Sequence, residues 1–207
     1  MHHIIKTGST GNAIIYFETV LLDCGVSFSL IKPFLYDIQL ILLSHIHGDH
    51  FNVSTLKRIA FERPSVRIGC GKWMLPFLEG FKNVDVYEPG KLYDYGSLKV
   101  SPVILYHDVP NYGYRIFKDG KKIIHCTDTN HLEGISAKGY DLYAIEANYN
   151  EETIWDKIRE RESQGEYAHQ RGSINSHLSE QAANDFFYKN RSEHSRLIRL
   201  HESTTSL

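Results

Sequence analysis

The sequence predicts an α/β fold with sheets in the middle and helices outside. Extended segments come in runs, and helical segments fall between groups of them, a pattern typical of packed layers. The stretch IQLILLS, residues 38–44, has no polar alternation after Gln39, which indicates a strand covered on both faces. The chain has 207 residues and is 42% hydrophobic, enough for one sizeable core. We therefore expect one domain over residues 1–207.

The first half of the chain is expected to alternate short strands with helical segments. Residues 13–25, AIIYFETVLLDCG, form two short strands joined at Glu18-Thr19, and TGSTGN before them forms a loop. Apolar side chains recur at helical spacing in VSTLKRIAFERP, residues 53–64, and the proline ends that helix. SVRIGC is a further strand, and a helical segment near Pro76 to Phe81 follows it. His2 and His3 alone indicate no more than an ordinary N-terminus.

The second half is expected to be richer in strands. Strands are predicted at VDVYEP, SLKVSPVILYH, YGYRIFKDGKKIIHCTD, DLYAIEAN and RLIRLH, with a hairpin turn around Asp119-Gly120. Helices are predicted at SEQAANDFFYKN and at the start of the charged stretch TIWDKIRERESQGEYAHQRG. Because loops that follow strand ends often carry chemistry, the ends of these strands are where a site is expected.

Composition narrows the functional classes. The formal net charge is −2, so long, processive binding of nucleic acid is disfavoured. The three cysteines are scattered and odd in number, which favours free thiols in a reducing compartment, and we expect a cytoplasmic protein. The N-terminal residues lack the apolar core of a secretory signal, and no apolar run approaches 18 residues. No association with a membrane is expected.

The stretch SHIHGDHFN concentrates ligand-type side chains directly after the apolar strand. Imidazole and carboxylate together suit zinc and other borderline divalent ions. While the chain is extended, His45 and His47 can project the same way, and Asp49 and His50 can address a second position after the turn at Gly48. This spacing favours a two-metal site. A surface histidine run, such as a tag remnant, is disfavoured because it would lack the buried strand and the aspartate.

The pattern SHIHGDH resembles the H-x-H-x-D-H hallmark of the metallo-β-lactamase superfamily. Four other segments resemble motifs of that superfamily: LLDCG the first, YHDVPNYGYRI the third, IIHCTDTN the fourth and RLIRLHES the fifth. With the hallmark they occur in the family's order and cover residues 7 to 203. The resemblance implies the αββα sandwich, in which two mixed sheets pack face to face with helices outside.

The resemblance also implies a set of metal ligands and two divalent ions, zinc foremost with manganese as the alternative. His45, His47 and His107 would hold one ion, Asp49, His50 and His201 the other, and Asp128 would bridge them. Asp23 would support a ligand from behind. Simpler interpretations stay open: Asp23 as a turn residue, His107 as an ordinary strand-end histidine, and His201 as part of a frayed tail.

Two branches of the superfamily share further segments with this chain. The opening TGSTGNAIIYFETVLLDCGVS is similar to that of the exonuclease-like YycJ/WalJ-type proteins. SHLSEQAA resembles the His-Ser/Thr motif of the tRNase Z group, although the long arm of that group is missing here. The catalytic residues implied are His177, which acts beside the metals on a phosphodiester, and Asp49. The alternative for His177 is a neighbour of a helix cap at Ser179.

Three functions are compatible with this resemblance. The first is a metal-dependent phosphodiester hydrolase of nuclease type, in which two metals activate a hydroxide and nucleic acid is the substrate. The second is a phosphodiesterase for small cyclic nucleotides, and the third is a thioester or lactone hydrolase. His177 discriminates among them, because an alkoxide leaving group benefits from a proton donor that an acyl hydrolase does not need. A homodimer is one option for the assembly.

Overall fold

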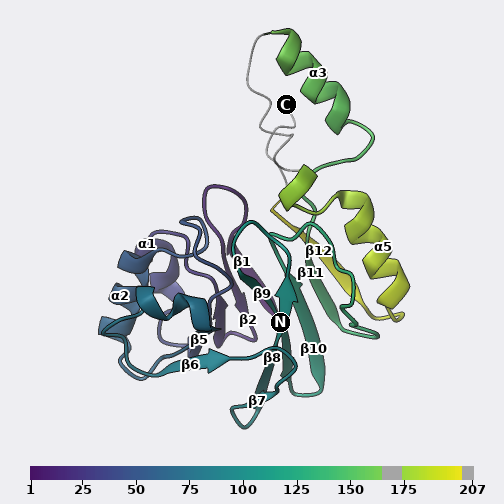
Figure 1. Cartoon of the computed structure of the whole chain (residues 1–207). Coiled ribbons are helices and arrows are strands. Elements are labelled where there is room, and N and C mark those ends of the chain that lie inside the picture. The colour runs from purple at the N-terminus through teal and green to yellow at the C-terminus, as the bar shows by residue number, and fades with distance from the viewer. Residues whose placement is uncertain (165–173, 202–207) are drawn as a thin grey trace.

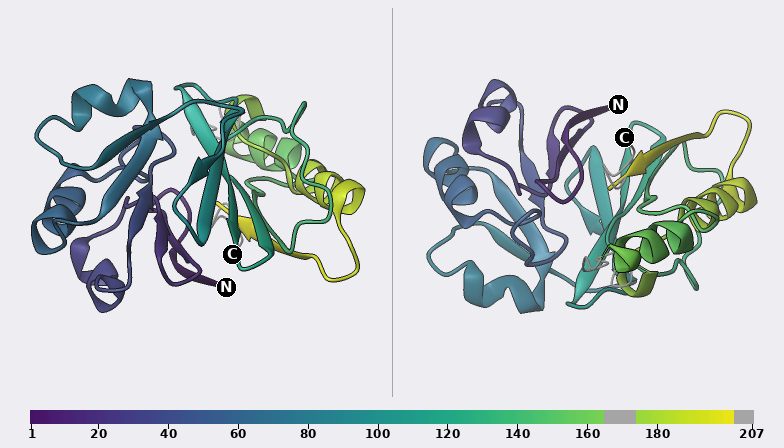
Figure 2. Two further views of the ribbon diagram at one scale, coloured as in Figure 1. Left: turned by 90° about the horizontal axis from the view of Figure 1, so that it is seen from below. Right: turned by 90° about the horizontal axis from the view of Figure 1, so that it is seen from above.

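The computed structural model describes residues 1–164 and 174–201. Two six-stranded sheets lie face to face, with α1 and α2 on the outer side of one and α5 on the outer side of the other (Figures 1 and 2). This confirms the predicted sandwich of two mixed sheets with helices outside. No helix within the described ranges combines the length and hydropathy needed to cross a membrane.

The first sheet is built in chain order from the N-terminal part of the molecule. Its strands β1 to β3 are antiparallel, and β3 to β6 are parallel. The strands are β1 His2–Lys6, β2 Ala13–Tyr16, β3 Val20–Leu22, β4 Leu40–Leu42, β5 Arg67–Gly71 and β6 Val84–Tyr87; the outer helices are α1 Phe28–Ile31, the 3-10 turn η1 Lys32–Phe34, and α2 Val53–Glu62.

The second sheet is built from the rest of the chain, with the order β12-β11-β10-β9-β8-β7. Strands β7 to β10 are antiparallel, and β10 to β12 are parallel. The strands are β7 Tyr93–Asp94, β8 Leu98–Leu105, β9 Asn111–Lys118, β10 Lys121–Cys126, β11 Leu142–Glu146 and β12 Arg196–Leu200; the helices are α3 Ile154–Ser163 and α5 Glu180–Asn190. Helix α3 projects away from the sheets (Figure 1).

Apolar side chains form three main layers, and β4 contributes to two of them. Leu40 and Leu42 pack between the two sheets, whereas Ile41 and Leu43 pack under α1 and α2. All four are at most 2% exposed. This is the predicted strand covered on both faces, and it explains the run without polar alternation. A third layer packs α5 against the second sheet through Phe186 and its neighbours.

Turns and caps follow local chemistry that the sequence shows. Asp119 and Gly120 have φ of 51° and 74°, the left-handed pair that a tight hairpin requires, so the predicted turn between β9 and β10 is confirmed. The side chains of Asn52 and Ser179 cap α2 and α5 by accepting a hydrogen bond from a backbone N–H three residues on. Both helices begin where the sequence predicts.

Some elements differ from the predictions. The segment expected to be helical near Pro76 to Phe81 is instead a 3-10 turn, η2, over Lys72–Phe77, because the proline cannot donate to a continuing helical ladder. His2 and His3 begin β1, which pairs with β2. The latter part of the charged stretch, residues 165–173, lies outside the described residues.

Three backbone segments meet where the site forms. Asn12 N–H donates to the Asp49 carbonyl at 2.6 Å, Cys24 N–H to His50 O at 2.9 Å, and Gly25 N–H to Asn12 O at 3.0 Å. A Cβ at Gly25 would lie 1.8 Å from Asp49 O, so only glycine fits there. The loop after β4 is therefore fixed from behind by the two N-terminal loops.

The three cysteines are buried and free. Burial raises the pKa of the Cys24 and Cys126 thiols to about 12, so both remain protonated. They pack as small apolar groups, as expected for thiols in this setting.

Candidate metal centre

The candidate site lies at the seam between the two sheets, on loops that leave the ends of four strands. His45, His47, Asp49 and His50 follow β4 of the first sheet. From the second sheet, His107 follows β8, Asp128 follows β10, and His201 follows β12. All seven predicted ligand residues are thus brought together, and the first sheet supplies four of them on one short loop.

A first group of side chains consists of His45, His47, His107 and Asp128, whose ligand atoms all lie within 4.8 Å of one another. His47 Nδ1 is 3.2 Å from His45 Nε2 and 3.3 Å from His107 Nε2. Asp128 Oδ2 is 3.4 Å from His45 Nε2. Three imidazole nitrogens and one carboxylate oxygen therefore face a common point.

A second group consists of Asp49, His50, Asp128 and His201, again within 4.8 Å. Asp128 Oδ2 is 3.2 Å from His50 Nε2, and Asp49 Oδ2 is 3.5 Å from His201 Nε2. Asp128 belongs to both groups, the position expected of a bridging carboxylate. Each group takes two side chains from the loop after β4 and two from the second sheet.

The residues fit divalent cations on chemical grounds. Nitrogens of neutral imidazoles that converge on each other cannot all be satisfied by hydrogen bonds among themselves. The buried Nε2 of His201 has no hydrogen-bond partner among the described residues. Such a cluster of nitrogen and carboxylate donors is what a divalent ion of zinc type requires.

Groups behind the site fix the orientation of the histidines. His50 Nδ1 donates to Asp23 Oδ2 at 2.6 Å, which leaves Nε2 toward the second group. Asp23 also accepts from the Ser44 backbone N–H at 2.8 Å and from its hydroxyl at 2.7 Å. His107 Nδ1 donates to the carbonyl of Ser176 at 3.0 Å. Asp23 lies behind His50, where its predicted supporting role places it.

Burial and neighbouring charges act in opposite directions on the pKa values in the cluster. Burial disfavours the charged form of His50, but the Asp128 and Asp23 carboxylates outweigh it and raise the pKa of His50 well above its usual value. Burial also opposes ionisation of Asp128, yet His50 and His45 hold the pKa of this carboxyl well below its usual range. Burial lowers the pKa of His45 and His107. The carboxylates around His50 thus stabilise positive charge in this part of the cluster.

Asp23, Asp128 and His201 share a left-handed backbone, with φ of 59°, 52° and 52°. This region is uncommon for residues other than glycine, and it clusters at functional sites. Asn111 holds the turn at Asp128, because its side-chain amide donates to Asp128 O at 2.7 Å. Thr7 Oγ1 accepts the backbone N–H of His201 at 2.9 Å, which ties the end of β12 to the N-terminal loop.

His177 lies beside the second group and is held by a residue that sequence reasoning missed. His177 Nδ1 donates to Glu146 Oε1 at 2.5 Å, and the His177 ring stacks on His201 with centroids 5.2 Å apart at 14°. Burial lowers the pKa of His177, but the bonded Glu146 outweighs it, so the net pKa is raised. Burial raises the pKa of Glu146, which is fully buried. The sequence feature that could have identified Glu146 is a carboxylate inside the otherwise apolar strand LYAIE.

A pocket of about 590 Å³ opens next to His107. It is lined by the segment 105–110, together with Asn130, Asn175 and Ser176. Because His107 belongs to the first metal group, this pocket adjoins the site and could receive part of a substrate.

Comparison with known proteins agrees with this geometry. The family model described as "Beta-lactamase superfamily domain" matches residues 18–179. A curated relative, ribonuclease Z of Thermosynechococcus vestitus (strain NIES-2133 / IAM M-273 / BP-1), is 28% identical over 118 residues. That match covers 48% of this chain and 29% of the relative, so the chain spans well under half of its length.

Two solved structures share the fold over nearly the whole chain. The metallo-beta-lactamase fold protein YhfI from Bacillus subtilis superposes with a TM-score of 0.75 at 14% identity, covering 100% of this chain and 87% of that one. The short form of human tRNase Z superposes with a TM-score of 0.69 at 19% identity, covering 98% and 93%. With the family model matching most of its length, this chain belongs to the beta-lactamase superfamily and has the metallo-β-lactamase fold.

Proposed function

We propose that the protein is a phosphodiester hydrolase of nuclease type that works with two divalent ions, zinc foremost and manganese as the alternative. The observation that most supports this proposal is that Asp128 belongs to both the first and the second group of metal-type side chains. The pair His177 and Glu146 lies directly beside it. When bound, two such ions lower the pKa of a water and neutralise the non-bridging oxygens of a phosphate.

The chain's own residues would divide the work as follows. His45, His47 and His107 hold the first ion, and Asp49, His50 and His201 hold the second. Asp128 binds both. Asp23 keeps His50 in the tautomer that presents Nε2, and the Ser176 carbonyl does the same for His107.

Asp49 and His177 carry the proton chemistry in this proposal. Burial opposes ionisation of Asp49, but His201 and His50 lower the pKa of its carboxyl, so it is ionised near neutral pH and can accept a proton from the attacking water. The Nδ1 of His177 is engaged by Glu146, so its Nε2 is the nitrogen that can donate a proton to the leaving alkoxide. The raised pKa of His177 keeps that proton available.

The pair of His177 and Glu146 also favours phosphodiester over acyl chemistry. A thioester or lactone hydrolase needs no buried carboxylate to keep a protonated imidazole beside its metals, whereas an alkoxide leaving group gains from one. The relative described as ribonuclease Z and the structural likeness to a tRNase Z support the same direction.

A substrate screen with metal added back tests this proposal. It would compare bis-p-nitrophenyl phosphate, cyclic mononucleotides, a thioester, a lactone, and end-labelled single- and double-stranded DNA and RNA. We expect metal-dependent loss of the end label, abolished in His47→Ala and retained in His194→Ala, an exposed histidine that belongs to neither metal group. Hydrolysis of the thioester or lactone without any phosphodiester cleavage would contradict the proposal.

A second candidate is a phosphodiesterase for small cyclic nucleotides. It is favoured by the pocket next to His107, in which no lysine or arginine is found among the lining residues that the structure describes. A groove that tracks a long nucleic acid would normally carry such residues. Preference for cyclic mononucleotides in the same screen would select this candidate.

A further inference from the structure

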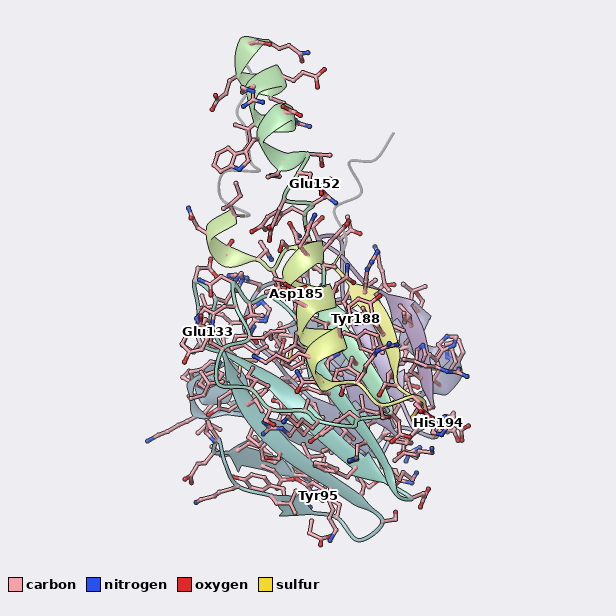
Figure 3. All side chains as sticks on the ribbon, turned by 90° about the vertical axis from the view of Figure 1, so that its right-hand side faces the viewer. Tyr95, Glu133, Glu152, Asp185, Tyr188 and His194 are labelled. Carbon is pink, nitrogen blue, oxygen red and sulfur yellow. The ribbon has the colours of Figure 1, made fainter. Side chains whose placement is uncertain are left out.

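An exposed aromatic side chain lies directly next to the candidate metal centre. Tyr106 follows β8 and is 47% exposed, and its ring stacks on that of His131 with centroids 4.1 Å apart and 26° between the planes. Figure 3 labels Glu133, on the same loop as His131, at the upper end of the second sheet, opposite the end that carries Tyr95. Neither Tyr106 nor His131 belongs to the groups of metal-type side chains.

The pair is held in place by a compact set of backbone hydrogen bonds. Tyr106 N–H donates to Thr129 Oγ1 at 3.0 Å, and Asn130 N–H donates to Tyr106 O at 2.9 Å. Thr129 Oγ1 donates in turn to His131 O at 2.9 Å. The Tyr106 ring is therefore presented on a fixed backbone and supported by a second ring, as a preformed stacking surface requires.

Its position sets what could lie on it. Tyr106 directly precedes His107, a member of the first metal group, and both line the 590 Å³ pocket. A phosphodiester held at the metals would therefore place one of its substituents against Tyr106. The neighbouring planar face suits a planar aromatic substituent, and a nucleobase is the common one.

The charge of the pocket also favours a nucleobase. Asp108, with 61% of its side chain exposed, lines it, and the described lining residues include no lysine or arginine. A second phosphate would meet the carboxylate of Asp108 there, which lies 3.1 Å from His107 Nε2. Asn130 also lines the pocket, and a carboxamide is a side chain that can pair with a base edge. The pocket fits an uncharged base and disfavours a further phosphate.

We propose that Tyr106, backed by His131, is the stacking platform for the nucleobase next to the scissile phosphodiester. This inference rests on the proposed phosphodiesterase function and deepens it, because it assigns the group that recognises the nucleoside part of the substrate. The alternative is a purely structural role, in which the two rings only pack one loop against another.

The test compares two substrates that differ in the nucleoside alone. Thymidine 5′-(p-nitrophenyl phosphate) carries a base, and methyl p-nitrophenyl phosphate does not; both release p-nitrophenol, so the leaving group is constant. In the metal-loaded Tyr106→Leu variant, we expect the kcat/KM ratio of the two substrates to fall about 5- to 150-fold, mainly through KM, since one base stacked on an aromatic ring is worth about that much. Tyr106→Phe should keep the ratio within about twofold.

The matched control is Tyr188→Leu, on α5, an exposed tyrosine (64% against 47% for Tyr106) outside the pocket lining (Figure 3). It should leave the ratio as in the unaltered protein. An unchanged ratio in Tyr106→Leu, or an equal fall in Tyr188→Leu, would overturn the platform while leaving the phosphodiesterase proposal intact. Thermal melting of each variant shows whether it is folded.

A binding measurement separates this inference from the proposed function. Thymidine 5′-monophosphate and ribose 5-phosphate are titrated calorimetrically into the metal-loaded protein. We expect Tyr106→Leu to weaken binding of the nucleotide by the same factor. The nucleotide should then bind no more tightly than ribose 5-phosphate. If no phosphodiester is hydrolysed but this advantage depends on Tyr106, the hydrolase proposal fails and the platform stands. If the advantage is independent of Tyr106, the platform fails.

Discussion

The imidazole of His177 stacks on that of His201, at a centroid distance of 5.2 Å and an interplanar angle of 14°. The two rings have different partners: His177 is bonded to Glu146, whereas the Nε2 of His201 has carboxylate oxygens of Asp49 and Asp128 at 3.5 and 3.8 Å. A residue suited to donating a proton is therefore packed against a residue suited to holding a metal. This arrangement gives a direct way of separating the two roles.

Replacing His177 should slow phosphodiester cleavage without removing metal. We expect His177→Ala to lower kcat by about 10²- to 10⁴-fold on substrates with an alkoxide leaving group, the usual contribution of a general acid. p-Nitrophenyl esters should be affected far less, because their leaving group needs no proton. Metal content by atomic emission should stay at the level of the unaltered protein; its loss would make His177 a ligand. Glu146→Gln should act in the same direction, since it removes the charge that raises the pKa of His177.

Replacing the shared carboxylate should affect both metal groups at once. Asp128→Ala is expected to lose metal and activity together, because Asp128 lies in each group and is buried with His45 and His50 around it. Asp119→Ala, in the hairpin turn between β9 and β10, is the control and should retain metal. Full activity of Asp128→Ala would rule out the two-metal proposal.

Chelation should lower thermal stability as well as activity. The buried carboxylates of Asp128 and Asp23 face several histidines only in the folded chain. An ion that binds there therefore stabilises the folded state over the unfolded one. An ion present at about 100 times its Kd contributes about 3 kcal/mol, which corresponds to roughly 5–10 °C in Tm for a chain of this size. Differential scanning calorimetry with and without EDTA measures this. An identical Tm in the two conditions would argue against bound metal in the folded protein.

Gly25 should be one of the least replaceable residues outside the ligand set. In Gly25→Ala the new Cβ would lie 1.8 Å from the Asp49 carbonyl, so the loop carrying Asp49 and His50 must move. We expect a loss of about 3 kcal/mol or more in the free energy of unfolding, together with lower metal affinity. Gly48→Ala, which meets nothing within 4 Å, is the matched control and should cost little in chemical denaturation.

His125 should make stability depend on pH. Its Nδ1 accepts from the Tyr16 hydroxyl at 2.8 Å, and burial lowers the pKa of His125 to about 4. The unfolded chain, with an ordinary histidine pKa near 6.5, binds the proton more readily than the folded one. Above about pH 6.5, His125 therefore does not lower the free energy of unfolding. As the pH drops toward 4, the free energy of unfolding falls by about 3 kcal/mol.

The matched variant for this prediction is His125→Asn, which keeps an acceptor for Tyr16 and cannot titrate. Urea unfolding of both proteins with EDTA present, between pH 4 and 7, isolates the difference. A slope of unfolding free energy against pH that is the same in both proteins would show that His125 is not the source.

Much of the fold could be predicted because the signals are local. The apolar run of β4, the Asp119-Gly120 turn and the cap at Ser179 each depend on a few neighbouring residues. The ligand set was predicted from the motif resemblance, and the structure brings those residues together. What was missed depends on contacts across the chain: β1 is a strand only because β2 lies beside it, and Pro76 falls in a 3-10 turn.

Glu146 was missed for a related reason. A single carboxylate in an apolar strand does not show in the sequence what it faces, and its partners His177, Thr129 and Leu178 come from other loops. Tyr106 likewise looks like an ordinary residue after a strand until His131 is placed against it.

The division of each metal group between the two sheets has a consequence for how the enzyme could be taken apart. Residues up to β6 contain the loop 45–50, and those from β7 onward contain His107, Asp128 and His201, so neither portion alone holds all members of the first or the second group. Bound ions would hold the two fragments together. The chain could be split in the exposed linker between Tyr87 and Tyr93. The mixed fragments should regain hydrolysis only where they reassociate, so catalysis would report their reassembly.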